Sequence, residues 1–551
     1  MSRIRLTAAA SFVCMILLLA RLFTIQVLGS RRLSSAAVAQ RAYGVQLEPA
    51  RGQILDRNRV PLTDFRRLSA VVFPCLVRDK ERASGIVSSV LGLNREAAEE
   101  AFSGPAPAKL REGVTADEAE ALRSAGVEGV LIVEESRRYS RTSLARHVVG
   151  YTDASGRGVA GIERAFDDQL RGEAAKSLAV CVDAAGRPLT GVGYRLLGRG
   201  TPGGGLDVVL TIDCKVQAAC ERVLDETFEW DGPGACKGAA VVVLDARTGE
   251  ILAMAARPQY DQDRVGDHIA DPRAPLLNRC VRPYVPGSVL KVVTAAAAIE
   301  EGRVGVGERF VCPGWVQVGP TRLECSSAVA GGHGVLGFRE ALAHSCNVAF
   351  AEVGRRIGAE TLIGYIRRFG FGRETGAVSS GESPGSVPDP LGATTGDVAG
   401  ISIGQWKLTA TPLQVAQAMT AVVNSGTMLP VTLVKEISTP GGRAVRVFPR
   451  PKPVRVVSPS TAAWVRRGLL DAVTYGSGRA AMVATVGSAG KTGSAETGRI
   501  SGGGSVLHAW FAGYAPALAP KYICCVLVEE GGYGGAVAAP MFRSIMEEIL
   551  R

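Results

Sequence analysis

Three short groups of residues have the types needed for acyl transfer through a serine. The first is Ser288 with Lys291, which follow Pro286-Gly287 at the start of an alanine-rich segment. A serine hydroxyl is a poor nucleophile until a nearby base takes its proton. Lysine can be that base when burial lowers its pKa, and a spacing of three residues places both side chains on one helical face. Ser288 and Lys291 are therefore a candidate nucleophile and base.

The second group is Ser345-Cys346-Asn347. On a tight turn, the hydroxyl of Ser345 can pass on a proton and the amide of Asn347 can hold a substrate amide. A match to either of these first two groups is common by chance in a chain of 551 residues, so neither carries much weight alone.

The third group is Lys491-Thr492-Gly493-Ser494. On an edge strand, Gly493 permits close approach of a substrate backbone. A lysine cation and neighbouring hydroxyls can bind a carboxylate. The order of the three groups along the chain, SxxK then SxN then KTG, is much more specific than any one of them.

The elements that must position these groups are readable from the sequence. The residues 292–301, ended by Gly302, favour a helix that begins beside Ser288. A strand at 207–212, a helix at 215–226, a hairpin of 239–244 and 251–256, strands at 509–514 and 522–528 and a helix at 541–550 are expected around it. Strands at both ends with helices between them predict an α/β domain with an antiparallel sheet over residues 206–551.

The N-terminal part of the chain predicts a membrane anchor followed by a separate domain. Residues 6–28 are mostly apolar and carry one charge, Arg21, which can extend toward the membrane interface. A cleaved signal peptide and a buried core helix are the alternatives, but the small residues 37–39 lie too far beyond the apolar run for cleavage. The flanking arginines do not decide the orientation. The glycine-rich stretch 199–205 marks the end of a mixed domain over residues 29–205.

Composition excludes several classes of protein. The net charge of +11 is spread along the chain, which argues against a nucleic-acid-binding arm and suits a membrane or polymer surface. The twelve cysteines are irregularly spaced, and the five histidines form no HExxH or CxxC-HxxxH pattern. We therefore expect neither a metal site nor a cofactor.

Together, the ordered motifs resemble those of the class B penicillin-binding proteins, the membrane-anchored peptidoglycan D,D-transpeptidases. The resemblance covers almost the whole chain. Further segments similar to family motifs are 51–58 (RGQILDRN), 145–151, 158–163, 245–256, 402–405 and 411–414. It implies a short cytoplasmic tail (1–5), a transmembrane anchor (6–28), a pedestal of the dimerisation type (29–205) and a transpeptidase domain (206–551).

The resemblance also implies a role for each candidate residue. Ser288 would attack the carbonyl of the penultimate D-Ala in a stem peptide, with Lys291 as its base. Ser345 would pass the proton to the leaving amine, and Asn347 would orient the peptide amide.

Lys491, Thr492 and Ser494 would bind the terminal carboxylate of the stem peptide, with Gly493 leaving room for it. The backbone N–H groups of Ser288 and Ser494 would form the oxyanion hole. No metal or other cofactor enters this scheme.

The location and partners follow from the same resemblance. Peptidoglycan substrate exists only outside the cytoplasmic membrane, so residues 29–551 are expected there. β-Lactams, which mimic D-Ala-D-Ala, would acylate Ser288. The implied protein partners are a membrane glycosyltransferase and other proteins of the division or sporulation machinery, and the Ser-Cys-Asn motif favours these two roles over elongation.

Three positions depart from the family pattern. Ser494 replaces the usual threonine of KTGT and keeps its hydroxyl. Trp406 stands where the GQG segment has its second glycine. Cys346, with Cys312 and Cys325 upstream, allows either a disulfide that restrains the site or three reduced thiols.

Two other functions remain open from the sequence. A hydrolase on the same fold, a D,D-carboxypeptidase or a β-lactamase, would need a deacylating base that the sequence does not reveal. A non-catalytic scaffold or β-lactam sensor would not need Ser288, Lys291, Asn347 and Lys491, all of which are present.

Overall fold

The computed structural model describes residues 2–28, 42–46, 51–63, 65–171, 176–181, 194–198, 205–228, 236–319, 321–378, 381–501 and 504–551. These residues form two compact units. The first contains 1–51, 64–138 and 171–205, and the second contains 52–63, 139–170 and 206–551. The predicted boundary at residue 205 is thus one border between the units, but two segments of the expected pedestal belong to the second unit.

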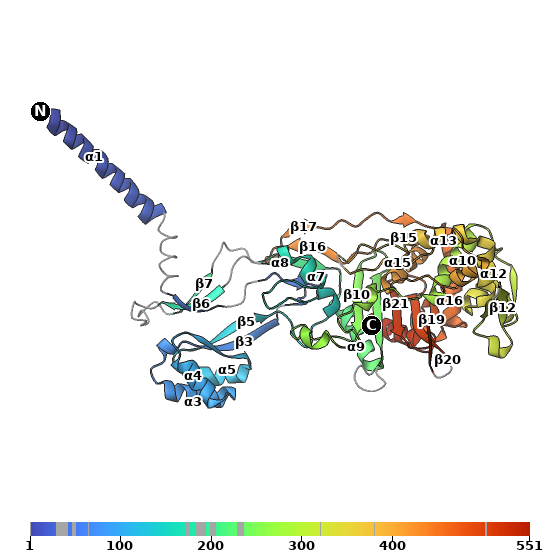
Figure 1. Ribbon diagram of the computed structural model, residues 1–551, viewed down its shortest axis with the longest axis horizontal. Helices are drawn as coiled ribbons and strands as arrows, with labels where there is room; N and C mark the ends of the chain where they lie inside the picture. Colours follow the sequence, from blue (N-terminus) through green and yellow to red (C-terminus); the bar gives the residue numbers. More distant parts are fainter. Residues whose placement is uncertain are drawn as a thin grey trace. The chain divides into compact units, whose positions relative to one another are not determined.

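The second unit is built on a five-stranded antiparallel sheet with the order β10-β9-β21-β20-β19 (Figure 1). Its strands are β9 (Gly238–Asp245), β10 (Ile251–Arg257), β19 (Ala489–Ser501), β20 (Gly504–Ala515) and β21 (Tyr522–Glu529). The antiparallel sheet confirms the predicted fold class. The KTG group lies on β19, which is an edge strand as expected.

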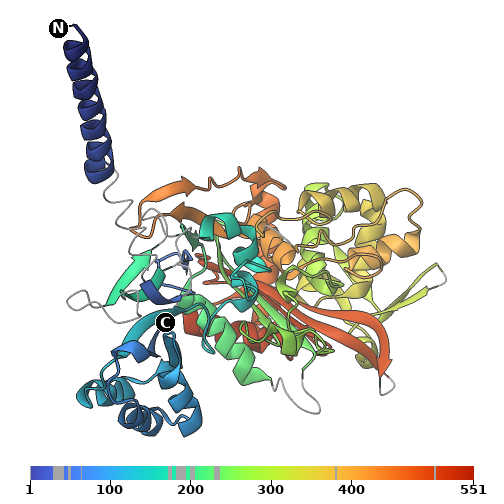
Figure 2. The same cartoon turned by 60° about the vertical axis from the view of Figure 1, so that its left-hand side comes forward.

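Alternate residues of these strands face two different helical layers, as the period of two requires. Val241, Val243 and Phe511 pack with α9 (Cys214–Thr227) and α17 (Ala538–Ile549). Val242 and Trp510 pack with α10 (Lys291–Glu300), α15 (Pro412–Val423) and α16 (Pro459–Thr474). The sheet therefore lies between two apolar cores, with helices on both of its faces (Figure 2). Ser288 and Lys291 stand at the start of α10 and Ser345 to Asn347 at the start of α12, in the larger helical layer, whereas the KTG group lies on the sheet itself.

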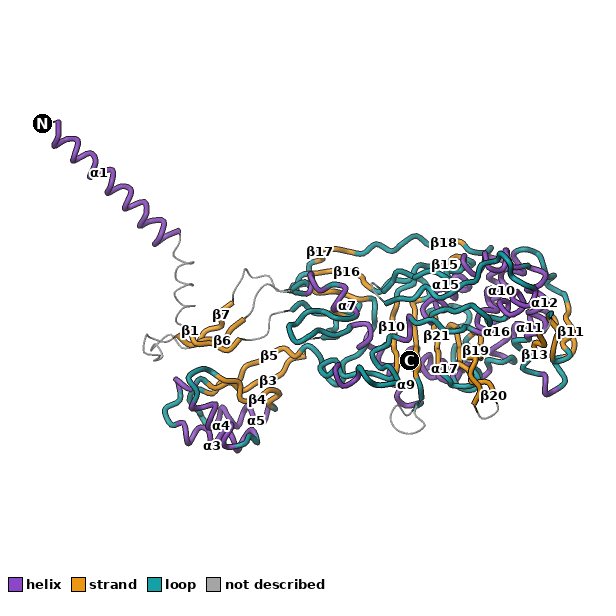
Figure 3. The backbone as a smooth tube through the Cα atoms, in the orientation of Figure 1, coloured by secondary structure: helices purple, strands orange, loops and turns teal. Residues whose placement is uncertain are grey.

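Further elements complete the larger helical layer. The helices are α11 (Phe338–Ala343), α12 (Asn347–Ile357), α13 (Ala359–Arg368) and α14 (Thr395–Ser402). Two short strand pairs precede α11: β11 (Arg309–Cys312) pairs with β14 (Gly334–Gly337), and β12 (Trp315–Val318) pairs with β13 (Thr321–Glu324). Strands β11 to β14 form an arm beside α11 and α12 (Figure 3). β15 (Thr427–Met428) pairs with β18 (Val454–Arg455).

A second sheet ties the RGQILDRN segment to the transpeptidase unit. Its order is β17-β16-β8-β2, from Ala444–Val447, Val434–Ser438, Asp207–Leu210 and Ile54–Leu55. Asp56, which is 1% exposed, accepts hydrogen bonds from the backbone N–H groups of Asn58, Val60 and Cys214. The segment therefore positions the start of α9 and has no place in the catalytic cluster.

The segment 139–170 is the second part of the expected pedestal that belongs to this unit. It holds the short helices α6 (Arg146–Val149), α7 (Gly161–Ala165) and α8 (Asp167–Leu170). Glu163, fully buried, accepts from the Tyr139 hydroxyl at 3.0 Å. Gln262 donates to Gly150 O, and His147 Nε2 lies 2.7 Å from Pro275 O. The segments 145–151 and 158–163, which are similar to family motifs, therefore pack as part of the transpeptidase unit.

The first unit has its own small core. Strands β3 (Phe65–Val72), β4 (Ala108–Val114) and β5 (Val130–Arg137) form an antiparallel sheet of order β4-β3-β5. Helices α3 (Lys80–Leu91), α4 (Arg95–Ser103) and α5 (Ala116–Ser124) cover it, and Val72, Val87 and Phe102 are fully buried. A second sheet pairs β6 (Lys176–Cys181) with β1 (Ala42–Gln46) and β7 (Tyr194–Gly198).

The N-terminal segment begins with α1 (Ser2–Phe23) and continues as a π-helical stretch over Thr24–Leu28. The apolar side chains of α1 that the structure describes are exposed, among them Leu17 at 64% and Leu18 at 70%. Measured by length and hydropathy, no helix in the described part of the chain reaches what crossing a bilayer requires. The transmembrane span at 6–28 stays a prediction.

Candidate active site

The nucleophile candidate lies on a tight turn at the start of α10. Residues Gly287–Leu290 form a 3₁₀ turn that leads directly into the helix, and Ser288 is partly exposed while its neighbours are buried. Gly287 has a φ of 57°, a left-handed conformation that favours glycine. Its N–H donates to Gly404 O at 2.9 Å. The turn therefore presents a hydroxyl to solvent from an otherwise buried backbone.

Lys291 connects the first two motifs. Its side chain is 0% exposed, and Nζ donates to Asn347 Oδ1 at 2.6 Å and to Ser345 O at 2.7 Å. Nζ also lies 3.4 Å from Ser345 Oγ and 5.3 Å from the centre of the Phe350 ring. Burial lowers the pKa of Lys291 to about 8, against the raising effect of the nearby thiols. A substantial fraction of this lysine is thus neutral at mildly alkaline pH, as a general base requires.

The Ser345-Cys346-Asn347 group forms the turn between α11 and α12. Ser345 has a φ of 59°, which is uncommon for a residue with a side chain and marks a held conformation. Asn347 begins α12, and its Nδ2 donates to Glu324 O at 2.8 Å. The amide group is therefore fixed by Lys291 on its oxygen and by the arm on its nitrogen.

The KTG group lies on β19 with its lysine buried. Lys491, at 0% exposure, donates from Nζ to Thr492 O at 3.0 Å and lies 3.5 Å from Thr492 Oγ1. Burial and the charge of Lys291 lower the pKa of Lys491 well below its usual value. Ser494 Oγ accepts from Gly534 N at 3.1 Å. The lysine and the two hydroxyl residues predicted to bind a carboxylate thus lie on one stretch of the edge strand.

Two glycines allow the motifs to approach each other. A Cβ at Gly493 would lie 3.0 Å from Pro286 O, so β19 packs closely on the nucleophile turn only without a side chain there. A Cβ at Gly404, whose φ is 76°, would lie 2.0 Å from Gly287 O. The sequence prediction assigned Gly493 to substrate approach, whereas the structure shows that it also admits the turn carrying Ser288.

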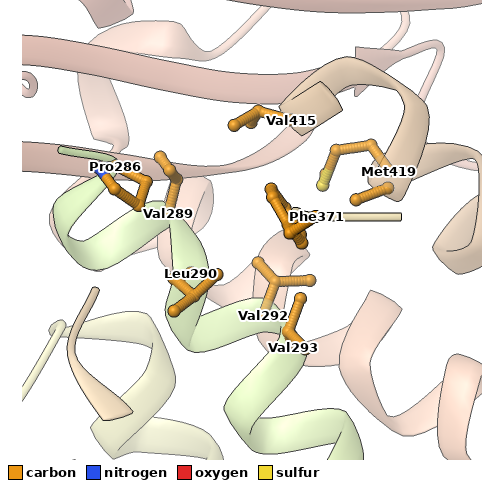
Figure 4. Close-up of a pocket in the computed structure, with 9 residues that line it drawn as sticks. Pro286, Val289, Leu290, Val292, Val293, Phe371, Val415 and Met419 are labelled. Carbon is orange, nitrogen blue, oxygen red and sulfur yellow. The ribbon is translucent and has the colours of Figure 1, made fainter. Parts of the chain in front are cut away.

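An apolar cavity lies behind the nucleophile turn. Pro286, Leu290, Phe371, Val415 and Met419 are among the side chains that line it (Figure 4). Figure 4 also shows Val289, Val292 and Val293 of the same turn and helix among the lining residues, all of which are apolar. This cavity belongs to the packing of α10 and offers no group for catalysis.

Trp406 has a left-handed backbone conformation, which is the reason that the GQG pattern usually has a glycine at this position. Its φ is 71°, in the left-handed region. The indole packs against α14 so closely that a Cβ at Gly400 would lie 2.3 Å from the ring. Trp406 in place of the second glycine thus puts an indole ring against α14. The first glycine of the pattern, Gly404, is present and contacts the nucleophile turn.

Sequence reasoning missed Ser477. Its Oγ lies 2.7 Å from Thr492 Oγ1 and 3.3 Å from Ala343 O, at the end of α11. It therefore links the KTG strand to the helix that precedes Ser345. The only signal in the sequence is a serine between two glycines, Gly476 and Gly478, which is too common to single out.

The three cysteines of interest lie together beside this site. Cys312, Cys325 and Cys346 are 1%, 5% and 0% exposed, and all are free thiols. The Sγ atoms of Cys325 and Cys346 lie 3.9 Å apart, too far for the covalent bond of a disulfide. The structure therefore contains the reduced alternative, and the hydrogen bond between the two sulfurs lowers the pKa of Cys325.

Comparison with known proteins now decides the family. Residues 239–547 match the penicillin binding protein transpeptidase domain, and residues 46–203 match the penicillin-binding protein dimerisation domain. The chain belongs to the class B penicillin-binding proteins. It is similar to "Stage V sporulation protein D" of Bacillus subtilis, with 32% identity over 96% of this chain and 82% of the relative.

Other members show the same relationship. "Probable peptidoglycan D,D-transpeptidase PenA" of Neisseria meningitidis is 31% identical over 78% of this chain and 71% of its own length. The crystal structure of penicillin-binding protein 3 from Mycobacterium tuberculosis, complexed with aztreonam, has 27% identity and a TM-score of 0.66. That match covers 92% of this penicillin-binding protein and 96% of the mycobacterial chain.

Proposed function

We propose that this chain is a peptidoglycan D,D-transpeptidase that works through a serine acyl-enzyme at Ser288. The observation that carries the proposal is the position of Lys291. Its Nζ donates to both Asn347 and Ser345, while Gly493 lets the KTG strand pack on the turn that holds Ser288. Three motifs that are far apart in the sequence thus share one place, as a serine acyltransferase needs.

In the acylation step, Ser288 Oγ attacks the carbonyl carbon of the penultimate D-Ala and its proton passes to Lys291. The peptide C–N bond then breaks, and the terminal D-Ala leaves after its nitrogen takes a proton through Ser345. The 3.4 Å between Lys291 Nζ and Ser345 Oγ supports this relay. In the second step the amine of a neighbouring stem peptide attacks the ester, forms the cross-link and releases the Ser288 hydroxyl.

Substrate recognition falls to the edge strand. Lys491, Thr492 and Ser494 bind the terminal carboxylate, because a cation beside hydroxyls forms strong charge-assisted hydrogen bonds. Asn347 orients the stem-peptide amide. The backbone N–H groups of Ser288 and Ser494 stabilise the tetrahedral oxyanion, an effect of about 3–4 kcal/mol for a single donor.

β-Lactams act on the same residues. Their ring carbonyl takes the place of the D-Ala carbonyl, and ring opening leaves an ester on Ser288. The complex of the mycobacterial relative with aztreonam supports this reactivity in the family.

The biological setting is cell-wall synthesis during division or sporulation. The similarity to the sporulation protein of Bacillus subtilis over 96% of this chain supports a sporulation role. The proposed partner is a membrane glycosyltransferase, which would supply the uncross-linked glycan strands that carry the stem peptides.

Residues 6–28 anchor the protein in the membrane, and the catalytic domain lies on the external side. The exposed apolar side chains of α1 support the anchor, since such a surface is costly in water. Resistance to alkaline carbonate extraction tests it, and release of the intact chain into the soluble fraction would contradict it.

Labelling with fluorescent penicillin tests the catalytic proposal. The purified full-length chain should form a stable covalent adduct, and Ser288→Ala should form none. Ser103→Ala, an exposed serine of the first unit, is the matched control and should label like the wild type. A wild-type chain that does not label would refute the transpeptidase, while rapid release of the label would indicate a β-lactamase.

A further inference from the structure

Four side chains with metal-binding atoms meet beside the catalytic turn. Cys312, Cys325, His333 and Cys346 place three sulfurs and one imidazole nitrogen within 4.8 Å of one another. The sequence predicted no metal site, because its histidines form no HExxH or CxxC-HxxxH pattern, and these four residues are 13, 8 and 13 positions apart. Only the fold brings them together.

The arm positions the first three ligands. Cys312 ends β11 and pairs with Gly334, the first residue of β14, so His333 directly precedes the strand that pairs with β11. Cys325 follows the β12–β13 hairpin, where its N–H donates to Gly314 O at 2.8 Å. A Cβ at Gly332 would lie 2.1 Å from Cys312 O, so the chain reaches His333 only through a glycine here.

The fourth ligand belongs to the catalytic motif. Cys346 is the N-cap of α12, a position where Ser, Thr, Asp or Asn is preferred, and its Sγ accepts from Ala349 N at 3.5 Å. Asn347 N donates to Cys325 Sγ at 3.3 Å. Backbone N–H groups directed at sulfur favour the thiolate form, which is the form that binds a metal.

Three of the six distances between ligand atoms are close to the edges of a tetrahedral zinc site, and the others are within 4.8 Å, so binding requires only a small inward movement of the side chains. With zinc–sulfur bonds of about 2.3 Å and zinc–nitrogen bonds of about 2.0 Å, two sulfurs lie about 3.8 Å apart and sulfur and nitrogen about 3.5 Å apart. Cys325 Sγ lies 3.9 Å from Cys346 Sγ, and His333 Nδ1 lies 3.4 Å from Cys325 Sγ and 3.6 Å from Cys312 Sγ.

We propose that Cys312, Cys325, His333 and Cys346 bind one Zn²⁺ ion that fastens the arm to the catalytic turn. The Cys₃His set is closed, without a carboxylate or an open position, which is typical of structural zinc rather than catalytic zinc. Binding releases the thiol protons. In the structure, Ser327 Oγ lies 3.0 Å from His333 Nδ1. When that nitrogen binds zinc, the Ser327 hydroxyl must turn away, and it can then donate to Cys325 Sγ.

The ion has a direct consequence for catalysis. Cys346 lies between Ser345, with its left-handed backbone, and Asn347, which contacts Lys291. A zinc ion that links Cys346 to Cys312, Cys325 and His333 therefore also restricts the movement of Ser345 and Asn347. Without the ion, hydrogen bonds alone maintain the turn, so acylation of Ser288 should slow while the rest of the fold persists.

Metal analysis of the full-length chain, purified in detergent with reductant and without chelator, tests the site. The wild type should contain one zinc per chain. Cys312→Ala and His333→Ala should each lose it, whereas Cys280→Ala and His268→Ala, which alter residues outside the cluster, should keep it. Zinc retained in the ligand variants, or a zinc-free wild type with a Cys325–Cys346 disulfide or free thiols, would overturn the proposal.

A second measurement avoids variants that fail to fold. Wild-type protein stripped with a chelator and titrated with Co²⁺ should show sulfur-to-cobalt charge transfer and the intense visible bands of a tetrahedral complex, saturating at one equivalent. The stripped protein should acylate with fluorescent penicillin at least ~10-fold more slowly, and Zn²⁺ should restore the rate. Absent bands would overturn the site, and an unchanged rate would overturn its effect on the turn. Labelling at full rate without zinc would leave the transpeptidase function intact.

Discussion

The catalytic cluster and the thiol–histidine cluster meet at residues 345–347 but are assembled differently. Lys291 is bound to Asn347 through a side-chain oxygen, whereas Cys325 is bound to the same residue through its backbone N–H. The catalytic cluster is made of groups three or fewer residues apart within each motif. The thiol–histidine cluster is made of single residues from three strand ends and a helix cap. The side chain of Asn347 thus belongs to the catalytic cluster, while its backbone N–H belongs to the thiol–histidine cluster.

Removing the base should have the largest effect. Lys291→Ala should lower the second-order rate of acylation by fluorescent penicillin ~10³-fold, because general-base catalysis contributes about 10²–10⁴-fold. Metal content should not change. Lys215→Ala, an exposed lysine of α9, is the control. A decrease below tenfold would remove Lys291 from the role of base.

Truncating Asn347 should separate the two clusters. Asn347→Ala removes the acceptor of Lys291 but keeps the backbone N–H that donates to Cys325. The lost charge-assisted hydrogen bond is worth about 1.5–3 kcal/mol, so acylation should slow roughly 10- to 100-fold. Metal analysis should still find the zinc. Loss of zinc in this variant would show that the two clusters cannot be separated at this residue.

Changing the pH should titrate Lys291, the base of the catalytic cluster. Because burial lowers the pKa of Lys291 to about 8, only about a tenth of it is neutral at pH 7. The acylation rate should therefore increase about tenfold between pH 7 and pH 9 and become constant above that. Stopped-flow or quenched labelling measures the profile. A rate that falls with increasing pH over this range would contradict the assignment.

The smallest effect on acylation is expected at a residue that only braces the fold. Asp56→Ala leaves three backbone N–H groups without their acceptor, each from a partly buried hydrogen bond. The free energy of unfolding should fall by roughly 2–4 kcal/mol, measured by urea denaturation, while acylation at 25 °C changes less than twofold. A large loss of acylation in folded protein would place this segment closer to catalysis than its contacts indicate.

Much of the fold was predictable because its signals are local. The hairpin of β9 and β10 and the terminal strands β20 and β21 follow from turn residues and apolar runs, and the edge position of the KTG group follows from the glycine of its motif. The contiguous pedestal was only partly predictable. Residues 52–63 and 139–170 belong to the second unit through contacts such as Asp56 with Cys214, and no local pattern reveals a partner 158 residues away.

The sequence by itself determined the chemistry: a serine, a lysine three residues later, and two further motifs in the order of a serine acyltransferase. Only the tertiary structure decided how these groups are tuned and held. Burial lowers the pKa of Lys291, Gly493 and Gly404 admit backbones that a side chain would exclude, and strand pairing brings His333 to Cys312. Desolvation and contacts of this kind depend on residues distant in sequence, so spacing along the chain cannot express them.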